Sequence, residues 1–341
     1  MSVGVLTAGG DCPGLNAAIR AVVTRLVVAG VDVVGVEKGW QGLMEGRTRP
    51  LHRDDVRGII ARGGTILGTS RVDPYVHGDG YSSVAPTIEA AGIETMIVLG
   101  GDGSLRTAAR LHEESGRVGV VGIPKTIDND IPGTDVSLGF HTAVQIVVDA
   151  IDRLTTTAES HDRIMVVEVM GRMAGWIATS SGIAGGAEAI VVPEVPTDYV
   201  ELARHIARRH EGGHDYSLVI VAEGAPGPSG DISTVGLDAF GFERLGGVGA
   251  RVARELESLT GYEARVTTLG YLQRGGIPTA FDRLLGTRFG INGAELALDG
   301  ATGVMVALRG NNITTVGLDE LASGDRKLDL ELLEDAAWFF A

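Results

Sequence analysis

Three glycine- and acid-rich loops follow apolar runs, and they limit the folds that this chain can adopt. GGD at residues 9–11 follows an apolar run at 3–6, and GGDGS at 100–104 follows another at 96–99. An apolar run that ends at paired glycines is typical of a buried strand entering a loop that can approach a phosphate closely. The third loop, PKTIDND at 124–130, adds a lysine and two carboxylates. Phosphate contacts, a Mg²⁺ ligand and a proton acceptor are the parts that phosphoryl transfer needs.

Strand-like runs alternate with amphipathic stretches, which predicts parallel sheets covered by helices on both faces. The predicted helices cover residues 16–29, 84–91, 105–114, 140–156, 199–210 and 248–259, and the predicted strands 3–6, 31–36, 96–99, 118–123, 163–169, 189–192, 217–221 and 266–269. Residues 74–83 and 225–234 are predicted to be loops. Ligands of such folds bind beyond the carboxyl ends of the strands, where all three glycine- and acid-rich loops would lie.

The amino-acid totals narrow the class of protein. The chain has 341 residues, which suits two α/β lobes better than one small domain. A formal net charge of −15 argues against nucleic-acid binding but still allows a local arginine cluster that binds a phosphorylated ligand. The single cysteine, Cys12, predicts a cytoplasmic protein without an internal disulfide. No uncharged apolar run is long enough to span a membrane, so no membrane partner is expected.

Each glycine- and acid-rich loop also has a purely structural interpretation. Either of the first two could be an ordinary turn into a helix, and neither fits a P-loop or a full dinucleotide fingerprint. On an extended stretch Asp128 and Asp130 would point the same way, so that one could accept a proton while the other supports metal or orientation. Alternatively they could form an Asx-turn or helix cap ahead of residue 140.

Five arginines are predicted to lie in glycine-containing loops or at strand starts rather than on helix faces. Guanidinium groups bind phosphate oxygens with two parallel hydrogen bonds, so these positions favour a polyanionic ligand. The arginines are Arg71, Arg163, Arg172, Arg265 and Arg274.

Five motifs carry a resemblance to a known family. They are GGDCPGLN at 9–16, GGDGS at 100–104, PKTIDND at 124–130, MGR at 170–172 and QRGG at 273–276. In this order they resemble the bacterial-type 6-phosphofructokinases, and the resemblance covers nearly the whole chain. It implies transfer of the terminal phosphoryl group of ATP to the 1-hydroxyl of fructose 6-phosphate, with Mg²⁺ as cofactor.

The resemblance implies roles for the residues that match family motifs. Asp128 would accept the hydroxyl proton, Thr126 and Asp130 would orient the reactants, and Arg172 would stabilise the developing charge. Gly10 and Arg71 would face the transferring phosphate, and Lys125 is a further candidate catalytic residue because a lysine suits a position near a phosphate. The ATP-binding residues would be Gly10, Arg71, Val72, Gly101, Asp102, Gly103 and Ser104, with Asp102 as the magnesium ligand. The sugar phosphate would contact Thr126, Asp128, Asp130, Met170, Gly171, Arg172, Glu223, Tyr271 and Arg274, and Arg163 and Arg265 would reach it from a neighbouring subunit.

Two residues indicate different phosphoryl donors. Gly103 is what ATP-using members carry, because a larger residue would crowd the α-phosphate of the nucleotide. Lys125 matches the pyrophosphate users, although some ATP users related to that branch combine it with glycine, as here. Because steric exclusion is harder to evade than an additional charge, we expect ATP. The alternatives are a pyrophosphate-dependent phosphofructokinase and a catalytically silent sugar-phosphate sensor on the same fold.

The resemblance also implies the domain organisation and the assembly. The fold would be α/β with two lobes, each a mainly parallel sheet flanked by helices, and the active site in the cleft between them. Residues 1–138, with a return of about 301–341, would form the nucleotide lobe, and 139–300 the sugar-phosphate lobe. Family members are typically homotetramers with shared active sites. Tyr271 stands where many members have a histidine, and its phenol can still donate one hydrogen bond to the sugar phosphate.

Overall fold

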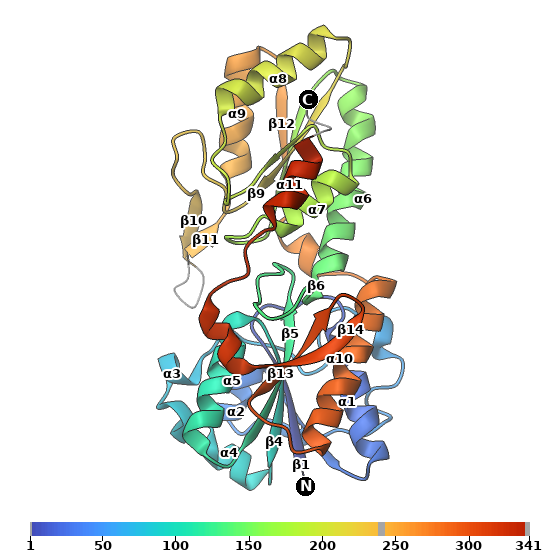
Figure 1. Cartoon of the computed structure of the whole chain (residues 1–341), viewed down its shortest axis with the longest axis vertical. Coiled ribbons are helices and arrows are strands. Elements are labelled where there is room, and N and C mark those ends of the chain that lie inside the picture. The colour runs from blue at the N-terminus through green and yellow to red at the C-terminus, as the bar shows by residue number, and fades with distance from the viewer. Residues whose placement is uncertain (1, 238–242, 338–341) are drawn as a thin grey trace. The chain divides into compact units, whose positions relative to one another are not determined.

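The computed structural model describes residues 2–237 and 243–337, and the chain forms two compact units (Figure 1). The first unit contains Met1–Thr142 and Arg274–Arg326, and the second contains Ala143–Gln273 and Lys327–Ala341. Each is built around a mainly parallel sheet, as the strand–helix alternation predicts.

The sheet of the first unit has the strand order β14-β13-β5-β4-β1-β2-β3, with β6 paired to β5. The central pairs are parallel, whereas the edge strands β3 and β14 are antiparallel to their neighbours. The strands are β1 (Ser2–Ala8), β2 (Asp32–Val36), β3 (Thr48–Pro50), β4 (Thr95–Gly100), β5 (Gly119–Thr126), β6 (Leu138–Gly139), β13 (Val304–Arg309) and β14 (Asn312–Gly317).

Helices cover both faces of this sheet, with α2, α4 and α5 on one side and α1 and α10 on the other (Figure 1). Because side chains alternate along a strand, Leu6 of β1 and Met96 of β4 join the core under α2, α4 and α5. The helices of this unit are α1 (Leu15–Val28), α2 (Gly39–Met44), η1 (Ile59–Ala61), α3 (Pro74–His77), η2 (Gly80–Ser83), α4 (Ala85–Ala90), α5 (Asp102–Ser115), α10 (Ala280–Leu298), η4 (Leu318–Ser323) and the start of α6 (Phe140–Glu159).

Glycines bring α10 into close contact with α1. A Cβ atom at Gly290 would lie 2.5 Å from the carbonyl oxygen of Ala18, and one at Gly286 would lie 2.9 Å from that of Gly14. This packing places α10 in the first unit, so the chain returns there at Arg274 rather than at about residue 301. The chain after Arg326 belongs to the second unit, where the Leu328 N–H donates to Glu194 and α11 packs on α7. Both boundaries differ from the predicted ones.

The second unit has a fully parallel sheet in the order β12-β7-β9-β8 and a separate antiparallel pair formed by β10 and β11. Its helix α9 packs on β7 and β12, and α7 packs on β8 and β9. The elements are β7 (Ile164–Val169), α7 (Trp176–Ala184), β8 (Ala189–Val191), α8 (Tyr199–Glu211), β9 (Ser217–Ala222), β10 (Thr234–Leu237), β11 (Glu243–Leu245), α9 (Val248–Thr260), β12 (Ala264–Thr268), η3 (Gly270–Arg274), the remainder of α6 and α11 (Leu330–Ala337).

The predicted helices and strands are all present, with ends shifted by a few residues. One predicted loop is wrong, because residues 74–83 contain α3 and η2. The Asp73 side chain caps α3 by accepting from the Tyr75 N–H, and Pro74 occupies the first helical turn, where its missing N–H costs nothing. Within the described ranges, no helix is both long and apolar enough to cross a membrane.

Candidate active site

The three glycine- and acid-rich loops lie at the carboxyl ends of β1, β4 and β5, which are neighbours in the first unit's sheet. The position predicted from the sequence is therefore confirmed. A Cβ atom added to Gly9 would lie 3.3 Å from Oγ of Ser104 and 3.4 Å from Nζ of Lys125. One residue from each loop thus converges on the same small volume.

Lys125 is buried at the end of β5, and its Nζ donates to the carbonyl oxygen of Gly10 over 2.6 Å. Burial lowers the pKa of Lys125, and the neighbouring Arg274 lowers it further, while Cys12, Asp128 and Asp11 act in the opposite direction. The lysine therefore ties the first loop to the third and brings a positive group to the place where they meet.

A fourth segment, residues 69–72, joins the site through the backbone of the first loop. The Gly9 N–H donates to the carbonyl oxygen of Ser70 over 2.9 Å, and the Thr69 hydroxyl donates to the carbonyl oxygen of Gly9 over 2.7 Å. These bonds hold residues 69 and 70 beside the first loop, and the predicted ATP-binding residues Arg71 and Val72 follow them directly in the sequence.

The second loop leads directly into α5, whose first residue is Asp102. Its carboxylate is held by Nε of Arg106, 2.9 Å from Oδ1 and 2.7 Å from Oδ2. A Cβ atom at Gly103 would meet no described atom within 4 Å. The loop therefore presents a helix amino terminus, which attracts anions, beside open space.

This arrangement fits a magnesium ion held mainly by a substrate. Among the described residues, no three His, Cys, Asp or Glu side chains gather closely enough to hold a metal ion. Mg²⁺, however, usually takes one or two carboxylates and completes its shell with phosphate oxygens and water. The side chain of Asp102 is 23% exposed and can supply one such carboxylate.

The third loop buries Asp128 and holds it in one orientation. Its N–H donates to Oγ1 of Thr126 over 3.1 Å, and the Thr126 hydroxyl is 3.3 Å from its Oδ2. Oδ1 is buried and has no hydrogen-bond partner among the described residues. Buried polar atoms are nearly always paired, so an unpaired carboxylate oxygen is a candidate for contact with a ligand.

The expected extended conformation of residues 128–130 is wrong. Asn129 has a φ of 56°, so the backbone turns between the two aspartates instead of alternating. Asn129 stabilises this turn, because its Oδ1 accepts from the Ser137 N–H over 2.9 Å and its Nδ2 donates to the carbonyl oxygen of Asp135 over 3.3 Å. Asp128 and Asp130 nevertheless stay close enough for the charge of Asp128 to affect Asp130.

Burial raises the pKa of Asp130 to about 7, and the charges of Asp128 and Asp325 contribute. In the unfolded chain its pKa would be about 3.9. The folded protein therefore holds this proton more tightly, and the stability that the neutral form provides is lost as the pH rises from about 4 to 7.

We expect Asp130→Asn to raise the thermal unfolding midpoint at pH 8, because a buried negative charge is removed. At pH 5 the rise should be clearly smaller, since Asp130 is then mainly neutral in the folded protein. Differential scanning calorimetry at both pH values tests this, with the exposed Asp32→Asn as the control. An equal shift at pH 5 and pH 8 would contradict the assignment of the raised pKa to Asp130.

Arg274 also lies at the first loop. Its Nη1 donates to the carbonyl oxygen of Asp11 over 3.3 Å, and a Cβ atom at Gly10 would lie 2.5 Å from the same nitrogen. Its buried Nε has no hydrogen-bond partner among the described residues. A side chain at position 10 would therefore push this guanidinium away from its present place at the loop.

In the second unit, the predicted sugar-phosphate residues follow the carboxyl ends of three neighbouring strands. Met170, Gly171 and Arg172 follow β7, Glu223 follows β9, and Tyr271 comes shortly after β12. The Arg172 N–H donates to Oε1 of Glu223 over 3.2 Å, and the Met170 N–H donates to Oε1 of Gln273 over 3.2 Å. Tyr271 is 66% exposed.

Glycines make this second cluster compact. Gly171 has a φ of 141°, and a Cβ atom there would lie 2.5 Å from the carbonyl oxygen of Ala174. A Cβ atom at Gly224 would lie only 1.8 Å from the carbonyl oxygen of Arg172. The loops after β7 and β9 therefore touch through their backbones, which fixes Arg172 beside Glu223.

Arg163 and Arg265 are not with this cluster. Arg163 precedes β7 and Arg265 is the second residue of β12, so both lie at the amino-terminal edge of the sheet. The six residues of β7 separate this edge from Arg172 by about 20 Å. Both arginines pair with Glu263, Arg163 through Nε over 2.6 Å.

Sequence reasoning missed the residues that hold the site loops. Asn129, Gln273 and Arg326 were assigned no role, yet Arg326 bonds the backbone of the third loop and Gln273 bonds Met170. Asn129 and Gln273 lie inside two of the family motifs, so their positions could have suggested a role in the site. Arg326 lies in a short polar stretch without any motif.

Comparison with known proteins agrees with this geometry. The family profile described as "PFK: Phosphofructokinase" matches residues 2–297. A pyrophosphate–fructose 6-phosphate 1-phosphotransferase of Streptomyces coelicolor is 49% identical over 343 residues, covering 100% of each chain. The ATP-dependent 6-phosphofructokinase 3 of the same organism is 50% identical over 321 residues, covering 93% of this chain and 94% of its own.

Among solved structures, Pichia pastoris phosphofructokinase in the T-state superposes with a TM-score of 0.84 at 31% identity. The match covers 99% of this chain and 36% of the yeast chain, so this chain spans about a third of that protein. Relatives that differ in their named phosphoryl donor are therefore about equally similar to this chain.

Proposed function

The chain belongs to the phosphofructokinase family and is a phosphotransferase, and we propose that it transfers the γ-phosphoryl group of ATP to the 1-hydroxyl of fructose 6-phosphate. The main support is the buried Oδ1 of Asp128, which lacks a hydrogen-bond partner in the described part of the chain and lies in the loop that carries Lys125. A pure binding protein would have no need of such a group.

Asp128 would act as the general base. The Thr126 hydroxyl, 3.3 Å from Oδ2, and the bond from the Asp128 N–H to Thr126 fix the carboxylate, so Oδ1 is the atom left to accept the proton of the attacking hydroxyl. Asp130 would orient the sugar. Because phosphoryl transfer needs alignment and charge stabilisation more than covalent help, fixed groups of this kind suffice.

The donor's phosphates would lie at the convergence of the first-unit loops. The backbone of Gly10 and Gly101, the hydroxyl of Ser104, the amino terminus of α5 and the segment of Arg71 and Val72 would bind them. Lys125 would add positive charge beside the transferring group. When bound, Mg²⁺ supplies charge neutralisation at the phosphates, and Asp102 would hold it.

The sugar phosphate would bind the second-unit residues Met170, Gly171, Glu223 and Tyr271 together with Arg274, and Arg172 would stabilise the transferring group. Arg163 and Arg265 lie at the opposite edge of their sheet, so they would serve the active site of a neighbouring subunit. This supports the expectation of a homotetramer with shared active sites. A cytoplasmic location and an active site in a cleft between the lobes stay predictions.

A side-by-side assay of the two phosphoryl donors tests the proposed function. Fructose 1,6-bisphosphate formation is measured with fructose 6-phosphate, Mg²⁺ and either ATP or pyrophosphate. We expect turnover with ATP and at least 100-fold less with pyrophosphate, because Gly103 leaves space for the nucleotide, and each factor of ten corresponds to about 1.4 kcal/mol. Turnover with pyrophosphate alone would establish the alternative donor, and turnover with neither would support the sugar-phosphate sensor.

A further inference from the structure

Two backbone carbonyl groups in the third loop are bonded from a distant part of the chain. The Arg326 N–H donates to the carbonyl oxygen of Asp130 over 2.7 Å, and Nη1 of Arg326 donates to the carbonyl oxygen of Asn129 over 3.3 Å. Residues 129 and 130 lie after the end of β5, where no strand pairing serves their carbonyls. Buried carbonyl groups need a donor, and Arg326 supplies one for each.

The Arg326 bonds support a loop whose backbone turns sharply. Asn129 is in the left-handed region, which asparagine adopts more readily than most residues with a side chain but which is still less favourable than the extended or right-handed regions. The bonds with Ser137 and Asp135 are made by the Asn129 side chain. The backbone carbonyl group of Asn129 therefore needs a different donor. The bond from the Arg326 guanidinium is charge-assisted, so it is stronger than a bond between neutral groups.

The surrounding charges favour a cation at this position. Asp128, Asp130 and Asp325 carry three carboxyl groups along the two segments, and the charges of Asp128 and Asp325 both act on Asp130. The Arg326 guanidinium, held at the Asn129 carbonyl, brings a positive charge to the segment that carries these carboxyl groups.

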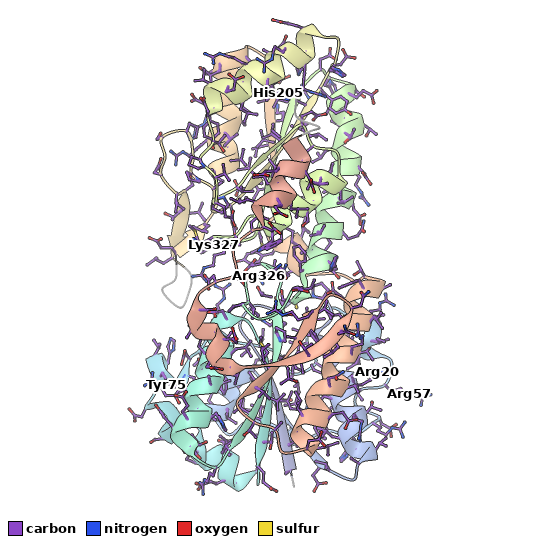
Figure 2. The ribbon with its side chains drawn as sticks, in the orientation of Figure 1. Arg20, Arg57, Tyr75, His205, Arg326 and Lys327 are labelled. Carbon is purple, nitrogen blue, oxygen red and sulfur yellow. The ribbon has the colours of Figure 1, made fainter. Side chains whose placement is uncertain are left out.

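Arg326 also lies outside the part of the chain that the family profile matches. The family profile matches residues 2–297, whereas Arg326 is the last residue of the first unit before the chain passes into the second. Figure 2 labels Arg326 and its neighbour Lys327 in this segment. The contact with the third loop therefore comes from a segment outside the match to the family profile.

We propose that Arg326 is a positioning residue that holds the Asp128–Asp130 loop in its active conformation through the carbonyl groups of Asn129 and Asp130. The proposal rests on the proposed function, since it assigns the loop a catalytic task. In this role Arg326 would act through the backbone that carries Asp128 and not as a group in contact with the substrate.

The test compares Arg326→Ala and Arg326→Lys with Lys327→Ala in the full chain. Lys327→Ala removes one exposed positive charge from the adjacent position and is the matched control. For Arg326→Ala we expect kcat about 10-fold lower, with KM for fructose 6-phosphate within about twofold, because one charge-assisted hydrogen bond is lost. Arg326→Lys should recover most of kcat, and millimolar guanidinium should partly rescue Arg326→Ala.

Amide hydrogen exchange gives a readout that does not depend on activity. We expect peptides covering residues 127–131 to exchange about 10-fold faster in Arg326→Ala than in Lys327→Ala, because one backbone constraint is lost. An unchanged loop, an unchanged kcat, or equal effects of Arg326→Ala and Lys327→Ala would overturn the proposal. Absence of phosphoryl transfer in the wild-type protein would instead refute the proposed function, while the exchange comparison would still test the loop contact.

Discussion

Replacing Asp128 with asparagine is expected to remove nearly all turnover while sugar-phosphate binding survives. Asparagine keeps the size of the side chain and can still accept from the Thr126 hydroxyl, which is 3.3 Å from Oδ2. It cannot take up a proton, so the 1-hydroxyl of the sugar loses its base. Loss of a positioned base typically lowers the rate by about 10²–10⁴-fold, or roughly 3–5 kcal/mol of transition-state stabilisation.

Steady-state kinetics and calorimetric titration with fructose 6-phosphate separate the two effects. We expect Kd to change by no more than about threefold, because only a proton-transfer group is lost. Asp135→Asn is a matched control from the same region, since the Asp135 carboxylate accepts from the Gly310 N–H and from Arg309 at the surface. Near-normal turnover combined with weak sugar-phosphate binding in Asp128→Asn would contradict the assignment of the base.

The elements of the fold could be predicted where local patterns decide them. The apolar runs inside β1, β4 and β5 are followed by loops with glycine or proline, so the burial of these strands could be predicted from the sequence. The unit boundaries could not be predicted in this way. They depend on the close packing of α10 against α1 at Gly286 and Gly290, which is a property of two helices far apart in the sequence.

For the candidate site, the sequence predicted which residue types take part but not the backbone conformation and contacts that arrange them. Three loops with glycines and carboxylates after apolar runs favoured phosphate and metal chemistry, so the loops of Gly9, Ser104 and Lys125 were predicted to belong to the site before their convergence was visible. The left-handed Asn129 breaks the extended stretch on which Asp128 and Asp130 would have pointed the same way, and side-chain bonds to Ser137 and Asp135 stabilise this turn. Nothing in the sequence relates Arg326 to that loop.

Similarity to relatives does not decide between ATP and pyrophosphate as the phosphoryl donor. Substitution of Gly103 can test this choice. Gly103 is the second residue of α5, and a Cβ atom there would meet no described atom within 4 Å. Aspartate should therefore be accommodated by the protein, and its charge is favourable in the first turn of a helix. Any loss of activity in Gly103→Asp would come from the ligand and not from misfolding.

We expect Gly103→Asp to lower kcat/KM for ATP by at least about 100-fold, because a carboxylate would crowd and repel the α-phosphate of the nucleotide at short range. The affinity for fructose 6-phosphate should stay within about threefold, and activity with pyrophosphate should be retained or gained, since Lys125 remains beside Gly10. The test measures kcat/KM with ATP and with pyrophosphate for the wild type and the variant. A thermal unfolding curve for each protein checks that the variant is folded.

Two further variants separate size from charge at this position. Gly103→Asn matches aspartate in volume without its charge, and Gly103→Ala adds only a methyl group. If repulsion dominates, asparagine should retain much more ATP activity than aspartate; if crowding dominates, the two should be equally poor and alanine intermediate. Full ATP activity in Gly103→Asp would mean that the α-phosphate of the nucleotide does not lie next to residue 103. Donor choice would then have to depend on Lys125, whose charge is buried and bonded to the first loop.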